Sequence, residues 1–77
     1  MINMSKKRFT VCGYGEILDS EKRFIFRTDA EEFYEEICHN DEYQSGSFTS
    51  TETGEVLAHF EKEEEDGYAK LILWVKK

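Results

Sequence analysis

A single apolar stripe near the middle of the chain constrains the fold more than any other sequence feature. The stripe repeats at the three- and four-residue spacing of one helix face. Its members are Ala30, Phe33, Tyr34, Ile37 and Cys38. This spacing predicts an amphipathic helix over residues 29–39, and such a helix needs a second layer on which to bury its apolar face.

Signals for both ends of this helix flank the stripe. Thr28 and Glu31 match the T-x-x-E capping box, which predicts Thr28 as the N-cap residue. Asn40 is a residue type on which helices commonly end. Together these signals bound the predicted helix on both sides.

The segments on either side of the helix alternate in the manner of β-strands. Gly13 and Gly15 interrupt the first of them, which indicates a β-bulge or a close approach of another backbone. In the fourth, Val56, Ala58 and Phe60 fall on one face. The predicted strands cover residues 8–18, 23–27, 47–51, 55–61 and 68–76, with turns at 19–22, 51–54 and 64–67.

The resulting order of elements is ββαβββ. Short connections favour antiparallel neighbours, and one helix cannot cover both faces of a sheet of about five strands. We therefore predict a two-layer α+β fold with a mostly antiparallel sheet. The amphipathic helix packs on one face, and the other face is partly wet. The single domain is expected to span residues 8–77, after a basic N-terminal tail at residues 1–7.

The size of the chain limits the functions it can have. Its 77 residues suffice for one domain but leave little volume for an internal substrate pocket. No run approaches about 18 apolar residues, and no apolar segment follows the basic start, so we expect neither a membrane span nor a signal peptide. Two cysteines, Cys12 and Cys38, are few for a secreted domain of this size and favour a cytoplasmic location.

The negative charge of the chain is concentrated in its central part. Residues 28–66 carry fourteen acidic side chains and one basic one, Lys62, for a net charge of −13. The segments before and after this block each carry a net charge of +3, and the whole chain carries −7. The modest total therefore hides a strong segregation of charge along the sequence.

Two clusters dominate this acidic block. On the predicted helix, glutamates four residues apart form like-charged pairs, which destabilise a helix slightly. Lysines at the later positions would stabilise it, so the helix forgoes an easy stabilisation. The second cluster lies on the predicted turn 64–67 and its approach. We predict as partner-binding residues Glu31, Glu32, Glu35, Glu36, Asp41, Glu42, Glu61, Glu63, Glu64, Glu65 and Asp66.

Two interpretations of the acidic residues are open. A charged face can simply keep a protein soluble. It can also steer and orient binding to a basic protein partner, as when surface carboxylates stand in for nucleic-acid phosphates. The partner would then be a nucleic-acid-binding effector, whereas direct binding of nucleic acid is opposed by charge repulsion.

The sequence matches no motif for catalysis or metal binding. The cysteines and histidines do not have the spacing of a zinc site. Cys12 and His59 could form a nucleophile–base pair on two strands, but no residue is placed to orient it. Residues 13–15 lack the rest of a phosphate loop, and residues 61–66 lack the ligand order of a calcium loop. We therefore expect no enzymatic activity, no metal and no cofactor.

An alternative binding surface is the sheet face that the helix leaves uncovered. Tyr14, Tyr68 and Trp74 fall on the strand faces that could form it, and exposed aromatic residues are enriched at interfaces. The protein would then be a structural or regulatory interaction module, or a homodimer rather than a monomer. Binding through this face would be insensitive to salt.

The overall profile resembles the small acidic proteins encoded by phages and mobile elements, including anti-CRISPR and other anti-defence inhibitors. It also resembles small immunity proteins and antitoxins. The resemblance lies in the chain length, the segregated charge and the missing catalytic residues. It implies an inhibitor that acts on a nucleic-acid-handling protein as a nucleic-acid mimic.

Overall fold

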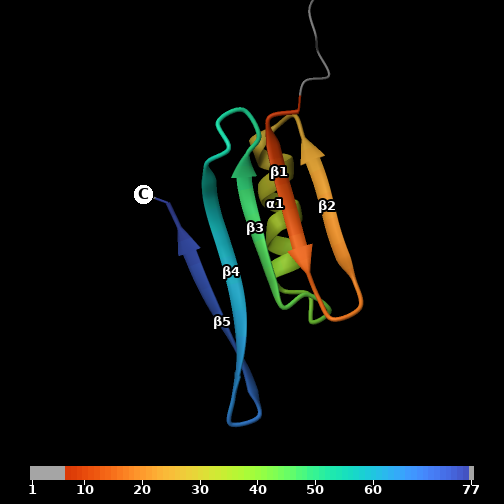
Figure 1. Ribbon diagram of the computed structural model, residues 1–77, viewed down its shortest axis with the longest axis vertical. Coiled ribbons are helices and arrows are strands. Elements are labelled where there is room, and N and C mark those ends of the chain that lie inside the picture. Colours follow the sequence, from red (N-terminus) through yellow and green to blue (C-terminus); the bar gives the residue numbers. More distant parts are fainter. Residues whose placement is uncertain (1–6, 77) are drawn as a thin grey trace, which may run out of the picture.

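The computed structural model describes residues 7–76, except for the side chains of Glu65, Tyr68 and Ala69 (Figure 1). Within them the order of elements is ββαβββ, as predicted. The predicted basic tail lies outside the described residues, apart from Lys7. The elements are β1 (Phe9–Tyr14), β2 (Asp19–Phe24), α1 (Arg27–Cys38), β3 (Ser45–Ser50), β4 (Val56–Glu65) and β5 (Tyr68–Val75).

The five strands form one antiparallel sheet in the order β2-β1-β3-β4-β5. Val11 of β1 lies opposite Lys22 of β2 and Phe48 of β3, so β1 lies inside the sheet. Helix α1 packs on one face, over β1, β3 and β2, while β4 and β5 extend beyond it (Figure 1). The predicted two-layer α+β fold is therefore confirmed.

The core lies between α1 and the sheet strands beneath it. Ala30, Ile37 and Cys38 of the predicted stripe are buried, and the other two members pack against the core. The ring of Tyr34 lies 5.8 Å from that of Phe48, measured between centroids, and equally far from that of Phe60. On the sheet side the buried hydrophobic side chains are Val11, Phe48, Ala58 and Phe60.

The start of the helix differs from the prediction. Helix α1 begins at Arg27, its N-cap residue is Phe26, and no side chain caps it. The predicted capping box of Thr28 and Glu31 is therefore wrong. The Phe26 carbonyl already accepts a hydrogen bond from Ala30 N at 3.2 Å, which places Thr28 inside the first turn. The Arg27 side chain reaches toward the sheet, with its guanidinium 5.7 Å from the centre of the Phe48 ring.

The turn between the first two strands also differs. Residues 19–22 belong to β2, so the predicted turn there is wrong, and the chain turns at residues 15–18 instead. Gly15 begins this turn, where the chain passes close to the loop after α1. Only glycine fits there, because a Cβ atom at residue 15 would lie 2.0 Å from the carbonyl oxygen of Glu42. The close approach predicted for a glycine in this region is thus confirmed at Gly15.

A register shift between β3 and β4 changes which residues of β4 face the helix. Thr49 pairs with Val56, whereas the preceding residue Phe48 pairs with Ala58, so Leu57 is an extra residue in β4. Leu57 packs against the core and Val56 is exposed. The prediction that Val56 shares a face with Ala58 and Phe60 is therefore wrong. It assumed unbroken alternation.

The hairpin of β4 and β5 is longer than the sequence indicated. Strand β4 continues to Glu65, and the turn is reduced to Asp66 and Gly67. Both turn residues have positive φ, 52° and 83°, which the Asp-Gly pair tolerates. Most of the second acidic cluster therefore lies on a strand rather than on a turn.

Candidate functional site

The glutamates of α1 project outward from the helix. Glu31, Glu32, Glu35 and Glu36 are all exposed, and the last three line a shallow surface hollow with His39. Glu31 lies near Arg27, with 3.9 Å between its Oε1 atom and Arg27 Nε. The helical spacing places these carboxylates on neighbouring turns outside the buried stripe, with Glu31 and Glu35 on the flank toward the outer strands.

The loop after α1 continues this acidic surface. Asp41 and Glu42 are exposed and, together with Glu16 from the β1–β2 turn, line a second hollow. The loop is held against β4, because Lys62 Nζ donates a hydrogen bond to the Asn40 carbonyl at 2.7 Å. Acidic residues from three separate segments therefore gather at one end of the molecule.

The acidic residues of β4 point in alternating directions. Lys62 points toward the helix side, since its Nζ atom reaches the loop after α1. Glu61 and Glu63 consequently lie on the opposite face of the sheet, and Glu64 lies on the helix side. Asp66 is exposed in the turn, and the side chain of Glu65 lies outside the described part of the chain.

These positions show how the predicted residues are arranged. The helix glutamates and the pair Glu61 and Glu63 lie on opposite sides of the sheet, so they do not form one flat surface. They extend toward the same end, where α1 and β4 finish (Figure 1). Basic side chains lie toward the other end, where β1 and α1 begin and β2 and β5 finish, and these include Arg8, Arg23, Arg27 and Lys76.

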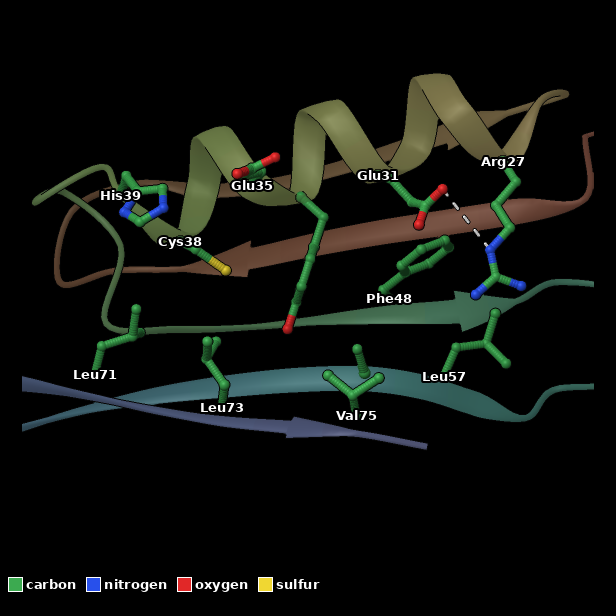
Figure 2. A pocket seen from close by; sticks show the side chains of 12 residues that line it. Arg27, Glu31, Glu35, Cys38, His39, Phe48, Leu57, Leu71, Leu73 and Val75 are labelled. Atoms are coloured by element: carbon green, nitrogen blue, oxygen red, sulfur yellow. Dashed lines mark ion pairs between the residues drawn. The ribbon is translucent and has the colours of Figure 1, made fainter. Parts of the chain in front are cut away.

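A groove of about 310 Å³ separates α1 from the outer strands (Figure 2). Its floor is apolar, and the side chains of Leu71, Leu73 and Val75 point from β5 toward the helix (Figure 2). Glu31 and Glu35 form its upper rim. The groove exists because α1 covers three strands of a five-stranded sheet.

Two titratable groups line this groove at the core boundary. Burial raises the pKa of the Tyr34 hydroxyl well above its usual value, with a smaller contribution from the Cys38 thiol. Burial likewise raises the pKa of Cys38. Both groups are therefore neutral near pH 7, and Cys38 behaves as a small apolar residue rather than as a thiolate nucleophile.

The possible nucleophile–base pair of Cys12 and His59 is not formed. Cys12 of β1 lies opposite Ser47 of β3, and Ser47 lies opposite His59 of β4. Two strand spacings separate Cys12 from His59, or about 9–10 Å between backbones. The His59 ring instead stacks on Trp74, with 5.0 Å between ring centroids and 18° between ring planes.

The aromatic residues of the open sheet face are also separated. Tyr14 and Trp74 are 49% and 44% exposed, but β3 and β4 lie between their strands. The side chain of Tyr68, the third predicted member, lies outside the described residues. Tyr14 and Trp74 therefore do not form a contiguous aromatic patch.

Within residues 7–76, no group of three or more histidine, cysteine or acidic side chains is placed to hold a metal ion. In the same residues, no helix has the length and apolar character needed to cross a membrane.

Comparison with known proteins gives no relative for this chain. No protein-family model, no curated protein and no solved structure matches it.

The groove residues Leu57, Leu71 and Leu73 were not identified from the sequence as lining a site. Alternation along the last strand does place Leu71 and Leu73 on one face. Nothing in the sequence indicates that the helix stops short of that face.

Proposed function

We propose that the protein is a small non-catalytic inhibitor that binds a basic surface of a nucleic-acid-handling protein. The acidic surface of α1 and the neighbouring acidic end occupy the site where that partner binds nucleic acid. Carboxylates then take the place of phosphates, and the protein is a nucleic-acid mimic of the kind encoded by phages and mobile elements.

The observation that carries this proposal is how few of the acidic side chains form ion pairs within the described part of the chain. Among residues 7–76, the ion pairs involve Glu21, Glu31, Glu52 and Glu55. Of the ten predicted partner-binding residues whose side chains are described, only Glu31 belongs to this group, at the long distance of 3.9 Å. The remaining described carboxylates are free to be neutralised by a cationic partner.

One further feature supports an intracellular role. Cys12 lies on the open face of the sheet and Cys38 is buried between α1 and the sheet, so the sheet separates the two thiols and they are free. A protein with free cysteines suits the reducing cytoplasm.

The test compares two variants with the same change in net charge. In the first, Glu32, Glu35 and Glu36 are replaced by Gln on the outer face of α1. In the second, Glu21, Glu52 and Glu55, which lie away from the acidic end, are replaced by Gln, which removes three surface ion pairs of small energetic value. Each protein is immobilised and used to capture proteins from a lysate of its host at low and high salt.

We expect the wild-type protein and the second variant to retain a nucleic-acid-binding protein at low salt. Added duplex DNA or RNA should release this partner. The helix variant should bind the purified partner at least about tenfold more weakly, which corresponds to roughly 1.4 kcal/mol. An equal loss in both variants, or an affinity independent of salt, would contradict the proposal.

A further inference from the structure

The outer edge of β5 is unpaired and apolar on both faces. Within residues 7–76, β5 hydrogen-bonds only to β4. Leu73 and Val75 are 56% and 64% exposed on the helix side, and Ile72 and Trp74 are 39% and 44% exposed on the open face. A long apolar edge of this kind presents backbone donors and acceptors that another strand can pair with.

The hydrogen-bonding pattern shows which residues offer their backbone outward. Lys76 N donates to the Leu57 carbonyl at 2.9 Å, so Lys76 turns its backbone groups toward β4. Because this orientation alternates along a strand, Trp74 and Ile72 also face β4. The backbone groups of Leu71, Leu73 and Val75 therefore point away from the sheet.

We infer that β5 pairs antiparallel with β5 of a second copy of this chain, with Ile72 on the two-fold axis. The lysines select this register. With Leu73 on the axis, Lys70 of one copy would lie opposite Lys76 of the other, and like charges would repel. With Ile72 on the axis, Lys70 lies opposite Trp74, a favourable cation–π partner.

The edge has the self-complementarity that a symmetric dimer requires. Leu71 and Leu73 flank Ile72 and pair with each other across the axis, so the same apolar segment serves both copies. With Ile72 on the axis, Lys76 of each copy lies opposite Tyr68 of the other, so like charges do not meet across the edge. The two molecules thus join into one ten-stranded sheet.

The first test measures the mass of the protein in solution. Sedimentation velocity of the full chain between about 1 and 500 μM should show a monomer–dimer equilibrium. Ile72→Lys places two like charges on the axis and should raise the dimer dissociation constant at least tenfold. Val56→Lys makes the same change at a residue of similar exposure, 41%, which lies on β4 and outside the free edge of β5, and should leave the constant unchanged.

A monomer at every concentration would overturn the inference, as would a dimer that Ile72→Lys leaves intact. Circular dichroism and urea unfolding of Ile72→Lys at low concentration check that the variant is folded. A folded monomeric variant supports the inference. If Ile72→Lys does not fold, the cross-linking test decides instead.

The second test examines the register directly. In antiparallel pairs that are not hydrogen-bonded, Cα atoms lie about 4.5 Å apart, within the range that a disulfide spans. Ile72→Cys, in a Cys12→Ser, Cys38→Ala background, should therefore give a covalent dimer on mild oxidation. Lys70→Cys in the same background should not, because Trp74 lies opposite. Rapid cross-linking of Lys70→Cys but not Ile72→Cys would exclude this register.

Discussion

The sheet has two edges, β2 and β5, and they are built differently. Strand β2 has the sequence DSEKRF, in which four of six side chains are charged. Its helix side is covered by α1, where the ring centroids of Phe24 and Phe33 lie 5.5 Å apart. Strand β5 has the sequence YAKLILWV, with one charged side chain in eight, and its helix side lines an open groove. Charge protects the first edge from pairing, and the second lacks that protection.

This contrast between the edges divides the domain into a part that α1 covers and a part that it leaves uncovered. The covered part consists of α1, β1, β2 and β3, and it supplies most of the buried core. The uncovered part is the β4–β5 hairpin beyond the reach of α1. Phe60 marks the border, since it belongs to β4 but is 1% exposed. Stability should therefore depend on the first part, and association on the second.

The largest expected effect on stability comes from a pair of alanine substitutions at two residues that lie opposite each other on β4 and β5. Phe60 of β4 lies opposite Leu73 of β5. Phe60→Ala should lower the free energy of unfolding by about 3–5 kcal/mol, because it empties a site beside the Tyr34 ring. Leu73→Ala should cost the monomer at most about 0.5 kcal/mol, because Leu73 is more than half exposed.

Urea unfolding of both variants, followed by circular dichroism at low protein concentration, measures these values. A small domain has a total stability of about 5–15 kcal/mol, so Phe60→Ala could leave little folded protein. Phe60→Leu is the milder control and should give an intermediate loss. Similar losses for Phe60→Ala and Leu73→Ala would show that the division is wrong.

The second comparison uses glycines from the two parts. A Cβ atom at Gly46 would lie 2.4 Å from the Phe60 ring and 2.6 Å from the Cys12 carbonyl oxygen. Gly46→Ala should therefore overpack the core and cost about 1–3 kcal/mol. At Gly67 nothing lies within 4 Å, but its φ of 83° disfavours alanine. Gly67→Ala should cost about 1 kcal/mol through the backbone alone.

The two glycine variants are distinguishable by more than the size of the loss. Crowding at Gly46 should change the near-ultraviolet signal of the packed aromatic rings, and Gly67→Ala should leave that signal unchanged. If Gly46→Ala were neutral in thermal and urea unfolding, the close packing over this part of the sheet would be disproved.

Most of the fold could be predicted because its signals are local. The stripe from Ala30 to Cys38 fixes the helix, and alternation fixes five strands, regardless of what each packs against. The predictions were wrong where a contact between residues far apart in the sequence determines the local structure. The β1–β2 turn depends on Gly15 passing the Glu42 carbonyl, and the face of Val56 depends on pairing with β3.

The candidate site was less predictable for the same reason. Sequence identifies the acidic residues, but their alternation on opposite faces follows only once β4 is seen to continue as a strand to Glu65. The pairing of β3 with both β1 and β4 is likewise needed to show that Ser47 lies between Cys12 and His59. The groove follows from the lateral position of α1 on the sheet, which no residue spacing encodes.

The smallest expected effect is a change in the free energy of unfolding with pH. It depends on Tyr34 and Cys38, which lie at the border between the covered and uncovered parts. Burial raises the folded-state pKa of Tyr34 above its usual 10.0 and that of Cys38 above 9.0. A raised pKa means that folding favours the neutral form. The resulting stability is complete below pH 9 and is lost as the pH rises through the folded-state values. The free energy of unfolding should therefore fall above pH 9.

Tyr34→Phe should make that fall shallower above pH 10, as measured by urea unfolding between pH 7 and 11. Tyr14→Phe is the matched control. Contact with the Cys12 thiol raises the pKa of Tyr14, but this residue is exposed on the open sheet face, where solvent screens the effect. Tyr14→Phe should thus change the pH profile less. Equal changes in the two profiles would mean that the Tyr34 hydroxyl is as accessible to solvent as the Tyr14 hydroxyl on the open face. In that case α1 would not bury the core at Tyr34.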